Sequence, residues 1–115
     1  MKTLIILNGA AYGDERTYNG LRLARSLAAE EVELRVFLMG DSVAAAKPGQ
    51  KTPEGYYNLE RMVKSLRAKG VAVGACGTCI DARGMTDEPL VEGVGRSSMA
   101  ELTTWTIWAD KVITF

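Results

Sequence analysis

Residues 2–8 read KTLIILN and residues 34–39 read LRVFLM, and these two stretches decide the fold class. Each is a short, nearly continuous apolar run that ends at a turn containing glycine. Runs of this length are typical of strands in a parallel sheet that helices cover on both faces. Similar runs at residues 71–75 and 111–115 predict two further strands.

Helical patterns lie between these runs. Apolar residues recur at helical spacing over residues 15–29, which predicts a first helix there. Asn58 is a candidate N-cap for a second helix, and Ser98 with Glu101 has the spacing of a capping box at the start of a third. Only a short strand fits near residues 90–94. Strands that alternate with helices predict one domain over all 115 residues, with a mainly parallel sheet between helical layers.

The composition excludes several classes of protein. The chain has 115 residues, 47% of them hydrophobic, and its 14 Lys+Arg balance its 14 Asp+Glu. A neutral chain lacks the basic excess with which nucleic-acid binders neutralise phosphates. The longest apolar run, residues 4–7, is far shorter than a membrane span, and residues 1–8 turn polar too soon to predict a signal peptide. We therefore expect a globular cytoplasmic protein without nucleic-acid or membrane partners.

The chain contains no histidine, and this limits its chemistry. A Ser-His-Asp triad, a Cys-His dyad and a zinc site with histidine ligands are all excluded within one chain. The two cysteines are too few for a four-ligand zinc site. The residues predict neither a metal nor a cofactor, so any chemistry must come from thiols, carboxylates, hydroxyls, lysine, arginine or backbone groups.

Both cysteines follow the third predicted strand, as Cys76-Gly77-Thr78-Cys79. Ligands of an open α/β sheet bind beyond the carboxyl ends of its strands, which places this loop at the ligand edge. A zinc site would lack two ligands here, and a thioredoxin-like motif would need an early strand, a following helix and flanking Trp and Pro. Two interpretations stay open: a reactive Cys76 thiolate with Cys79 as its neighbour, or two small buried core residues. On the first, we expect Cys76 to be partly exposed and to be alkylated faster than Cys79.

A thiolate at Cys76 needs partners that lower its pKa. The candidates are Arg83 and the backbone amides of a tight turn at Gly77 and Thr78. A solvated surface charge is the other interpretation of Arg83.

The loop after the first strand offers an opposite wall for such a site. Asn8 and Tyr12 are the candidate side chains, and Gly13 belongs to the same small and flexible segment. The segment matches neither the GxGxxG nor the P-loop pattern, so it predicts no nucleotide site. A plain strand-to-helix turn that needs glycine dihedral angles is its other interpretation.

Four motifs together resemble the DsrE/DsrF-like family. They are NGAxYGxE after the first strand, FLMxD after the second, CxxCxDxRG at the cysteines and WTxxADKVxxF at the C-terminus. The resemblance covers essentially the whole chain and is nearest to the YchN-type subgroup of single-domain homo-oligomers. It implies a three-layer α/β/α fold with a five-stranded, mainly parallel sheet, and assembly into a homotrimer or homohexamer.

Sulfur-relay relatives in that family carry a persulfide on one cysteine and pass its sulfur to a partner protein. Their cysteine lies seven residues before an Arg-Gly or Lys-Gly turn, and counting back from Arg83-Gly84 reaches Cys76. The resemblance implies that Cys76 takes sulfane sulfur from a donor protein and passes it to an acceptor, as a sulfurtransferase or sulfur carrier. Cys79, which those relatives usually lack, would resolve the persulfide or pack beneath the loop. The alternative is a non-catalytic oligomeric binding module whose cysteines sense redox state.

The aromatic residues predict a subunit contact. Trp105 is expected to pack the last helix against the sheet, whereas Trp108 and the Tyr56-Tyr57 pair are expected at an interface. Together with the resemblance, this predicts an oligomer of at least trimer size, with a hexamer as the expected form. The Cys76 loop is expected near a subunit boundary.

Overall fold

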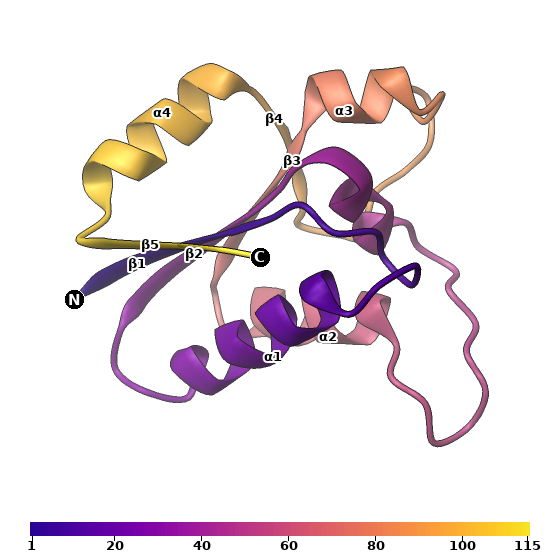
Figure 1. Cartoon of the computed structure of the whole chain (residues 1–115), viewed down its shortest axis with the longest axis horizontal. Coiled ribbons are helices and arrows are strands. Elements are labelled where there is room, and N and C mark those ends of the chain that lie inside the picture. Colours follow the sequence, from indigo (N-terminus) through magenta and orange to yellow (C-terminus); the bar gives the residue numbers. More distant parts are fainter.

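The computed structural model describes all residues from Met1 to Phe115 and contains one five-stranded sheet (Figure 1). The strands are β1 (Lys2–Leu7), β2 (Glu33–Leu38), β3 (Ala72–Cys76), β4 (Gly95–Ser97) and β5 (Lys111–Thr114). Their order across the sheet is β4-β3-β2-β1-β5, and every neighbouring pair is parallel. Helices pack around this sheet in a three-layer α/β/α fold, so the predicted fold class is confirmed.

The central strands are buried because helices cover both of their faces. Leu4 of β1 and Val36 of β2 are fully buried. Leu7 of β1 lies opposite Leu38 of β2, which in turn lies opposite Ala75 of β3. The carboxyl ends of these three strands are therefore level, and the segments that follow them meet at one edge of the sheet.

Helices α1 (Arg16–Ala28) and α2 (Leu59–Ala68) lie side by side on one face of the sheet, and α4 (Met99–Trp108) lies on the other (Figure 1). Trp105 of α4 is buried and meets the ring of Phe37 edge-on, with 5.9 Å between ring centroids. The predicted role of Trp105 in packing this helix against the sheet is confirmed. None of the helices combines the length and the apolar character that crossing a membrane requires.

Two predicted helix caps are present. The Asn58 side-chain oxygen accepts the backbone N–H of Arg61 at 3.1 Å at the start of α2. At the start of α4, the Ser98 hydroxyl accepts the N–H of Glu101 at 3.2 Å. Each cap satisfies a backbone donor that has no partner within the first helical turn.

Three elements differ from the sequence-based expectation. The fourth strand is β4, a short edge strand that follows residues 90–94 and carries no apolar run. The segments after β2 and β3 were expected to be loops but form short helices, η1 (Gly40–Ala46) and α3 (Gly77–Ala82). In η1, the Ser42 hydroxyl donates to the Leu7 carbonyl at 2.8 Å and fastens the helix to the end of β1. Helices this short lack the repeated apolar pattern by which longer ones are predicted.

Candidate thiol site

Cys76 ends β3 and is the N-cap of α3, so the Cys-x-x-Cys segment opens a helix where a loop was expected. The Cys76 Sγ atom accepts a hydrogen bond from the backbone N–H of Cys79 at 3.3 Å. The sulfur takes the place that a serine or aspartate oxygen fills in an ordinary N-cap. The two cysteines therefore share the first turn of α3, and the Cys79 thiol is near enough to affect the pKa of Cys76.

The exposure of the two cysteines is the reverse of what the sequence predicts. Cys76 is only 8% exposed and belongs to the core, whereas Cys79 is half-buried. Strand β4 closes off this position, because a Cβ atom on Gly77 would lie 2.9 Å from the Ser97 carbonyl oxygen and 3.1 Å from the Arg96 guanidinium carbon. The expected partial exposure of Cys76 is therefore wrong. Because the glycine at position 77 has no side chain, β4 can pass this close to the start of α3.

Burial also determines the charge of Cys76. It raises the pKa of the Cys76 thiol, and contact with the Cys79 thiol raises this pKa further. The backbone N–H groups of Cys79 and Thr78 lower it, because they stabilise a thiolate, but burial outweighs them. Cys76 is consequently a neutral thiol at neutral pH, and the predicted lowering of its pKa by the Thr78 amide is present only as the weaker effect.

Cys79 connects the thiol pair to the ends of β1 and β2. Its Sγ atom accepts the backbone N–H of Gly40, the first residue of η1, at 3.2 Å. Gly40 has a φ of +55°, and a Cβ atom there would lie 3.6 Å from the carbonyl oxygen of Asn8, the residue after β1. Segments from three strand ends thus converge at this edge, where the fold class places a ligand site.

Arg83 lies on the Cys79 side of the pair. Its Nη2 atom lies 2.7 Å from the Asp41 carboxylate, and its Nη1 donates to the Cys79 carbonyl oxygen at 3.1 Å. The guanidinium therefore fixes the end of α3 against η1. Its direct partners are a carboxylate and a carbonyl oxygen, and Cys76 is not among them.

Arg96 of β4 is the arginine whose charge would interact with a thiolate at Cys76. Its guanidinium lies over Gly77 and forms an ion pair with Asp81, with 2.7 Å between Nη2 and a carboxylate oxygen. The pKa of Arg96 is raised mainly by Asp81, and the negative charge of a Cys76 thiolate raises it as well. Sequence alone does not single out Arg96, because it lies far beyond Cys76 in an edge strand without a motif. Only the pairing of β4 with β3, which sets Cys76 opposite Ser97, brings it to the site.

The first loop contributes less directly to the thiol pair. Asn8 is exposed, and its backbone and side-chain N–H groups donate to the Phe115 carbonyl at 2.8 and 3.3 Å. The Tyr12 hydroxyl donates to the Gln50 side chain and accepts the N–H of Leu59 at 3.0 Å. These bonds direct Tyr12 toward the start of α2.

The predicted site residues therefore divide into two groups. Those in or bonded to the Cys-x-x-Cys turn are Cys76, Gly77, Thr78, Cys79 and Arg83, with the backbone of Asn8 next to Gly40 at the same edge. Tyr12 and the exposed Gly13 after it belong to the loop that leads to α1.

The site is built from thiols, backbone amides and arginine–aspartate pairs. No group of three or more Cys, Asp or Glu side chains lies close enough to hold a metal ion. The two cavities of the chain are lined by other residues, and neither includes Cys76 or Cys79. Thr78, which is exposed, and the half-buried Cys79 form the side of the site that faces solvent.

The sequence profile of the DsrE/DsrF-like family matches the chain over residues 1–115. The chain belongs to this family. Protein YchN of Escherichia coli K12 is 47% identical to it over 116 residues, which cover 99% of this chain and 98% of YchN. Protein MJ0989 of Methanocaldococcus jannaschii is 36% identical over 115 residues, which cover 100% of both chains. The resemblance drawn from the four sequence motifs is confirmed.

Two solved structures share the fold described above. The crystal structure of the YchN protein from E. coli matches with a TM-score of 0.95 at 47% identity, covering 100% of this chain and 99% of that one. Protein MTH1491 of Methanobacterium thermoautotrophicum matches with a TM-score of 0.78 at 21% identity, over 99% of this chain and 98% of that one. At that identity, the second match concerns the fold alone. The family and the fold are thereby shown, whereas the reaction has to be inferred from the thiol pair itself.

Proposed function

We propose that this DsrE-like protein handles sulfane sulfur at the Cys76–Cys79 pair, with Cys76 as the acceptor and Cys79 as the resolving thiol. The observation that carries the proposal is the placement of both thiols in the first turn of α3, at the carboxyl edge of the sheet, where the Cys79 backbone N–H donates to Cys76 Sγ at 3.3 Å. Membership in the DsrE/DsrF-like family supports it, because that family includes sulfur-relay proteins. The protein would act as a sulfurtransferase or sulfur carrier.

The loading step exchanges one sulfur–sulfur bond for another. Cys76 loses its proton, and its Sγ atom attacks the outer sulfur of a donor persulfide. A bond forms between Sγ and that sulfur, the sulfur–sulfur bond of the donor breaks, and the donor leaves as a thiolate that can take up the proton. No external oxidant is needed, because one such bond breaks for each that forms.

Two routes unload the persulfide. In the first, an acceptor thiolate attacks the outer sulfur and takes it over as a persulfide, which returns Cys76 as a thiolate. In the second, the Cys79 thiolate attacks Cys76 Sγ, so that a Cys76–Cys79 disulfide forms and hydrosulfide leaves. The two electrons that the thiols give up reduce the sulfane sulfur to sulfide. The disulfide then requires a dithiol reductant, as transient cytosolic disulfides do.

The raised pKa fits an acceptor that is protected when no donor is bound. A thiolate is the nucleophile in these reactions, so a neutral and buried Cys76 thiol reacts slowly with small oxidants. The N–H groups of Thr78 and Cys79 and the Arg96 guanidinium stabilise negative charge on Cys76 once the proton has left. Removal of the proton is therefore the step that these groups assist.

Intact-mass measurement tests the proposal. The wild-type protein and the variants Cys76→Ser and Cys79→Ser are incubated with glutathione persulfide as the donor. We expect the wild type and Cys79→Ser to gain the mass of one sulfur atom per chain, which dithiothreitol removes. Cys76→Ser should retain none, because thiols in solution exchange away a persulfide on the more open Cys79. Cys79→Ser should hold the sulfur longest, because it lacks the internal release route. Absence of the adduct from Cys79→Ser, which lacks the internal release route, would support the alternative of a non-catalytic binding module with redox-sensing cysteines.

We further propose that the protein works in the cytoplasm as a homotrimer or homohexamer, with the donor and acceptor proteins as transient partners. Apolar side chains on α4 and on β5, which follows it, support an interface there: Ile107 is 81% exposed, Met99 62% and Val112 41%. Large apolar groups on a surface of this kind mark interaction sites. A chain without net charge offers little electrostatic resistance to self-association.

The aromatic residues expected at a subunit contact differ in their surroundings. Tyr57 is stacked on Tyr18 with 4.0 Å between ring centroids, so this chain itself accounts for its position. Tyr56 is 71% exposed. Trp108 is half-buried, and the Arg35 guanidinium lies 4.0 Å from its ring centroid. Trp108, on the same helix as the exposed Met99 and Ile107, is therefore the aromatic residue that we propose for the interface, whereas Tyr56 lies with α1 and α2 on the other face of the sheet.

A further inference from the structure

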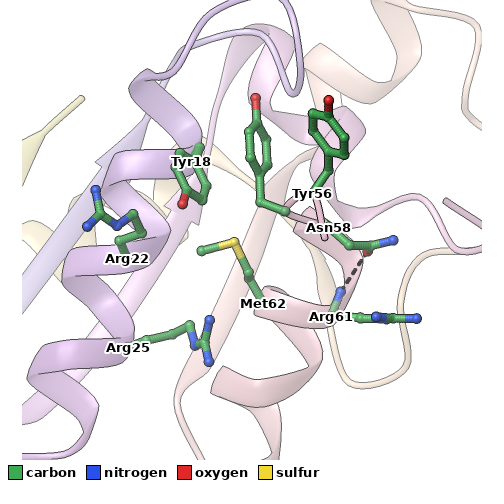
Figure 2. Close-up of a pocket in the computed structure, with 8 residues that line it drawn as sticks. Tyr18, Arg22, Arg25, Tyr56, Asn58, Arg61 and Met62 are labelled. Atoms are coloured by element: carbon green, nitrogen blue, oxygen red, sulfur yellow. Dashed lines mark hydrogen bonds between the residues drawn. The ribbon is translucent and has the colours of Figure 1, made fainter. Parts of the chain in front are cut away.

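A second candidate site lies away from the cysteines, between α1 and the start of α2. It is a cavity of about 380 Å³ to which both helices and the loop before α2 contribute side chains. Figure 2 shows Arg22 and Arg25 on the α1 side of this cavity and Arg61 with Tyr56 on the α2 side. Its volume is within the range of about 300–1,000 Å³ that is typical of small-molecule sites.

The cavity carries positive charge without a carboxylate to balance it. Arg22, Arg25 and Arg61 line it, no acidic residue does, and none of the three forms an ion pair in this chain. By contrast, the arginines at the carboxyl edge of the sheet each pair with an aspartate. An arginine fork matches phosphate and carboxylate oxygens in a bidentate way, so this cavity suits an anionic group.

The wall of the cavity is aromatic, and tyrosine rings there stack on one another. The Arg22 guanidinium lies 5.5 Å from the centroid of the Tyr18 ring, which stacks on Tyr57 at 4.0 Å. Tyr57 in turn stacks on Tyr12 at 5.8 Å. Tyr56, which also lines the cavity, is 71% exposed and is therefore free to take a planar ring against its face. Charged and aromatic side chains thus line the same cavity.

We propose that this cavity binds a small phosphate ester that carries an aromatic ring, the chemical class of a nucleoside monophosphate. The arginines take the phosphate, and Tyr56 takes the ring. A phosphate lacking the ring loses the stacking contact, and a ring lacking the phosphate leaves the three arginines without an anion. The site shares no residue with the thiol pair, so it is a binding function in addition to sulfur handling.

Isothermal titration calorimetry tests this with adenosine 5′-monophosphate as the probe and with ribose 5-phosphate and adenosine as its two halves. The full chain should bind the monophosphate about tenfold or more tightly than either half. Arg25→Gln should weaken that binding by about tenfold, as the loss of a charge-assisted hydrogen bond would. Tyr56→Ala should reduce the affinity for the monophosphate to that for ribose 5-phosphate.

Lys111→Gln is the matched control, because it removes one positive charge from exposed β5, outside the cavity. It should leave the affinity for the monophosphate nearly unchanged. An equal loss in Arg25→Gln and Lys111→Gln would reveal unspecific charge attraction and overturn the proposal. No binding of the probe, or binding no tighter than that of ribose 5-phosphate, would also overturn it. Circular dichroism of each variant checks that any loss of affinity occurs in a folded protein.

Discussion

Cys76 and Cys79 lie in one helical turn, yet their surroundings give them different chemistry. Core side chains and β4 enclose Cys76, whose sulfur is held by the N–H of Cys79. Cys79 is more open and accepts only the N–H of Gly40. An enclosed sulfur is protected from exchange with thiols in solution, which attack persulfides and disulfides directly. This division of roles is the basis of the proposed mechanism.

The difference in burial predicts how the two thiols are alkylated. At neutral pH, iodoacetamide should label Cys79 several-fold faster than Cys76, the reverse of the order expected from sequence. Because burial raises the pKa of Cys76 above the usual thiol value of 9.0, its labelling rate should keep rising as the pH passes that value. Peptide mass spectrometry after timed labelling measures both rates. Fast labelling of Cys76 at neutral pH would contradict the burial described here.

Arg96 is predicted to stabilise the charged form of Cys76. Arg96→Gln in a Cys79→Ser background should raise the pKa of Cys76 further, because the cation that faces the thiolate is lost. Arg83→Gln in the same background is the matched control and should leave this pKa unchanged, since Arg83 is bonded to Asp41 and Cys79. The ultraviolet absorbance of the thiolate, followed during a pH titration, reports both. Equal shifts of the Cys76 pKa in the two variants would show that Arg96 does not specifically stabilise the thiolate.

At the scale of single elements, the long and regular pieces could be predicted and the short ones could not. Strands β1 and β2 are apolar runs, and α1 has the spacing of an amphipathic helix, so burial alone specifies them. The elements α3 and β4 are short, and contacts distant in sequence hold them in place. Those two elements bury Cys76 and bring Arg96 to it, and for this reason the exposure and partners of the thiol could not be derived from local pattern. The location of the two cysteines could be predicted, because ligands of an open α/β sheet bind beyond the carboxyl ends of its strands.

Helix α2 offers a direct test of a cap that the sequence did predict. Asn58 is buried, its side-chain oxygen accepts the Arg61 N–H, and its amide group donates to the Gln50 carbonyl at 3.1 Å. Asn58→Ala should lower the free energy of unfolding by about 1–2 kcal/mol, the usual loss for an N-cap together with a buried carbonyl left without its donor. Asn58→Asp keeps the cap acceptor and should lose less. Urea denaturation measures both, and equal losses would show that the cap itself contributes little.

The whole molecule has three surfaces of different character. Its carboxyl edge carries the thiol pair beside arginine–aspartate pairs, and the α1–α2 face carries arginines without carboxylate partners. On the opposite face, α4 exposes the large apolar side chains of Met99 and Ile107. A helix with apolar residues beyond its core-facing side is typical of one that is covered in an assembly. The proposed sulfur handling, anion binding and self-association would therefore use separate parts of the chain.

The exposure of Ile107 predicts how assembly depends on α4. Ile107→Glu should shift the protein from a trimer or hexamer to smaller species, because a charge would be buried without a partner at the contact. Ser26→Glu adds the same charge to exposed α1, on the other face of the sheet, and should leave the assembly intact. Light scattering coupled to gel filtration measures the mass of each. A wild-type mass near 12.4 kDa would refute assembly outright.

The most direct test of the central claim is to locate the transferred sulfur on the chain. After reaction with glutathione persulfide, free thiols and persulfides are alkylated and the protein is digested with trypsin, which releases both cysteines on the peptide of residues 70–83. Fragmentation of that peptide assigns the extra sulfur to one cysteine. We predict that it is found on Cys76 in the wild type and in Cys79→Ser alike. Extra sulfur on Cys79 alone, with Cys76 carrying only the alkyl group, would contradict the account.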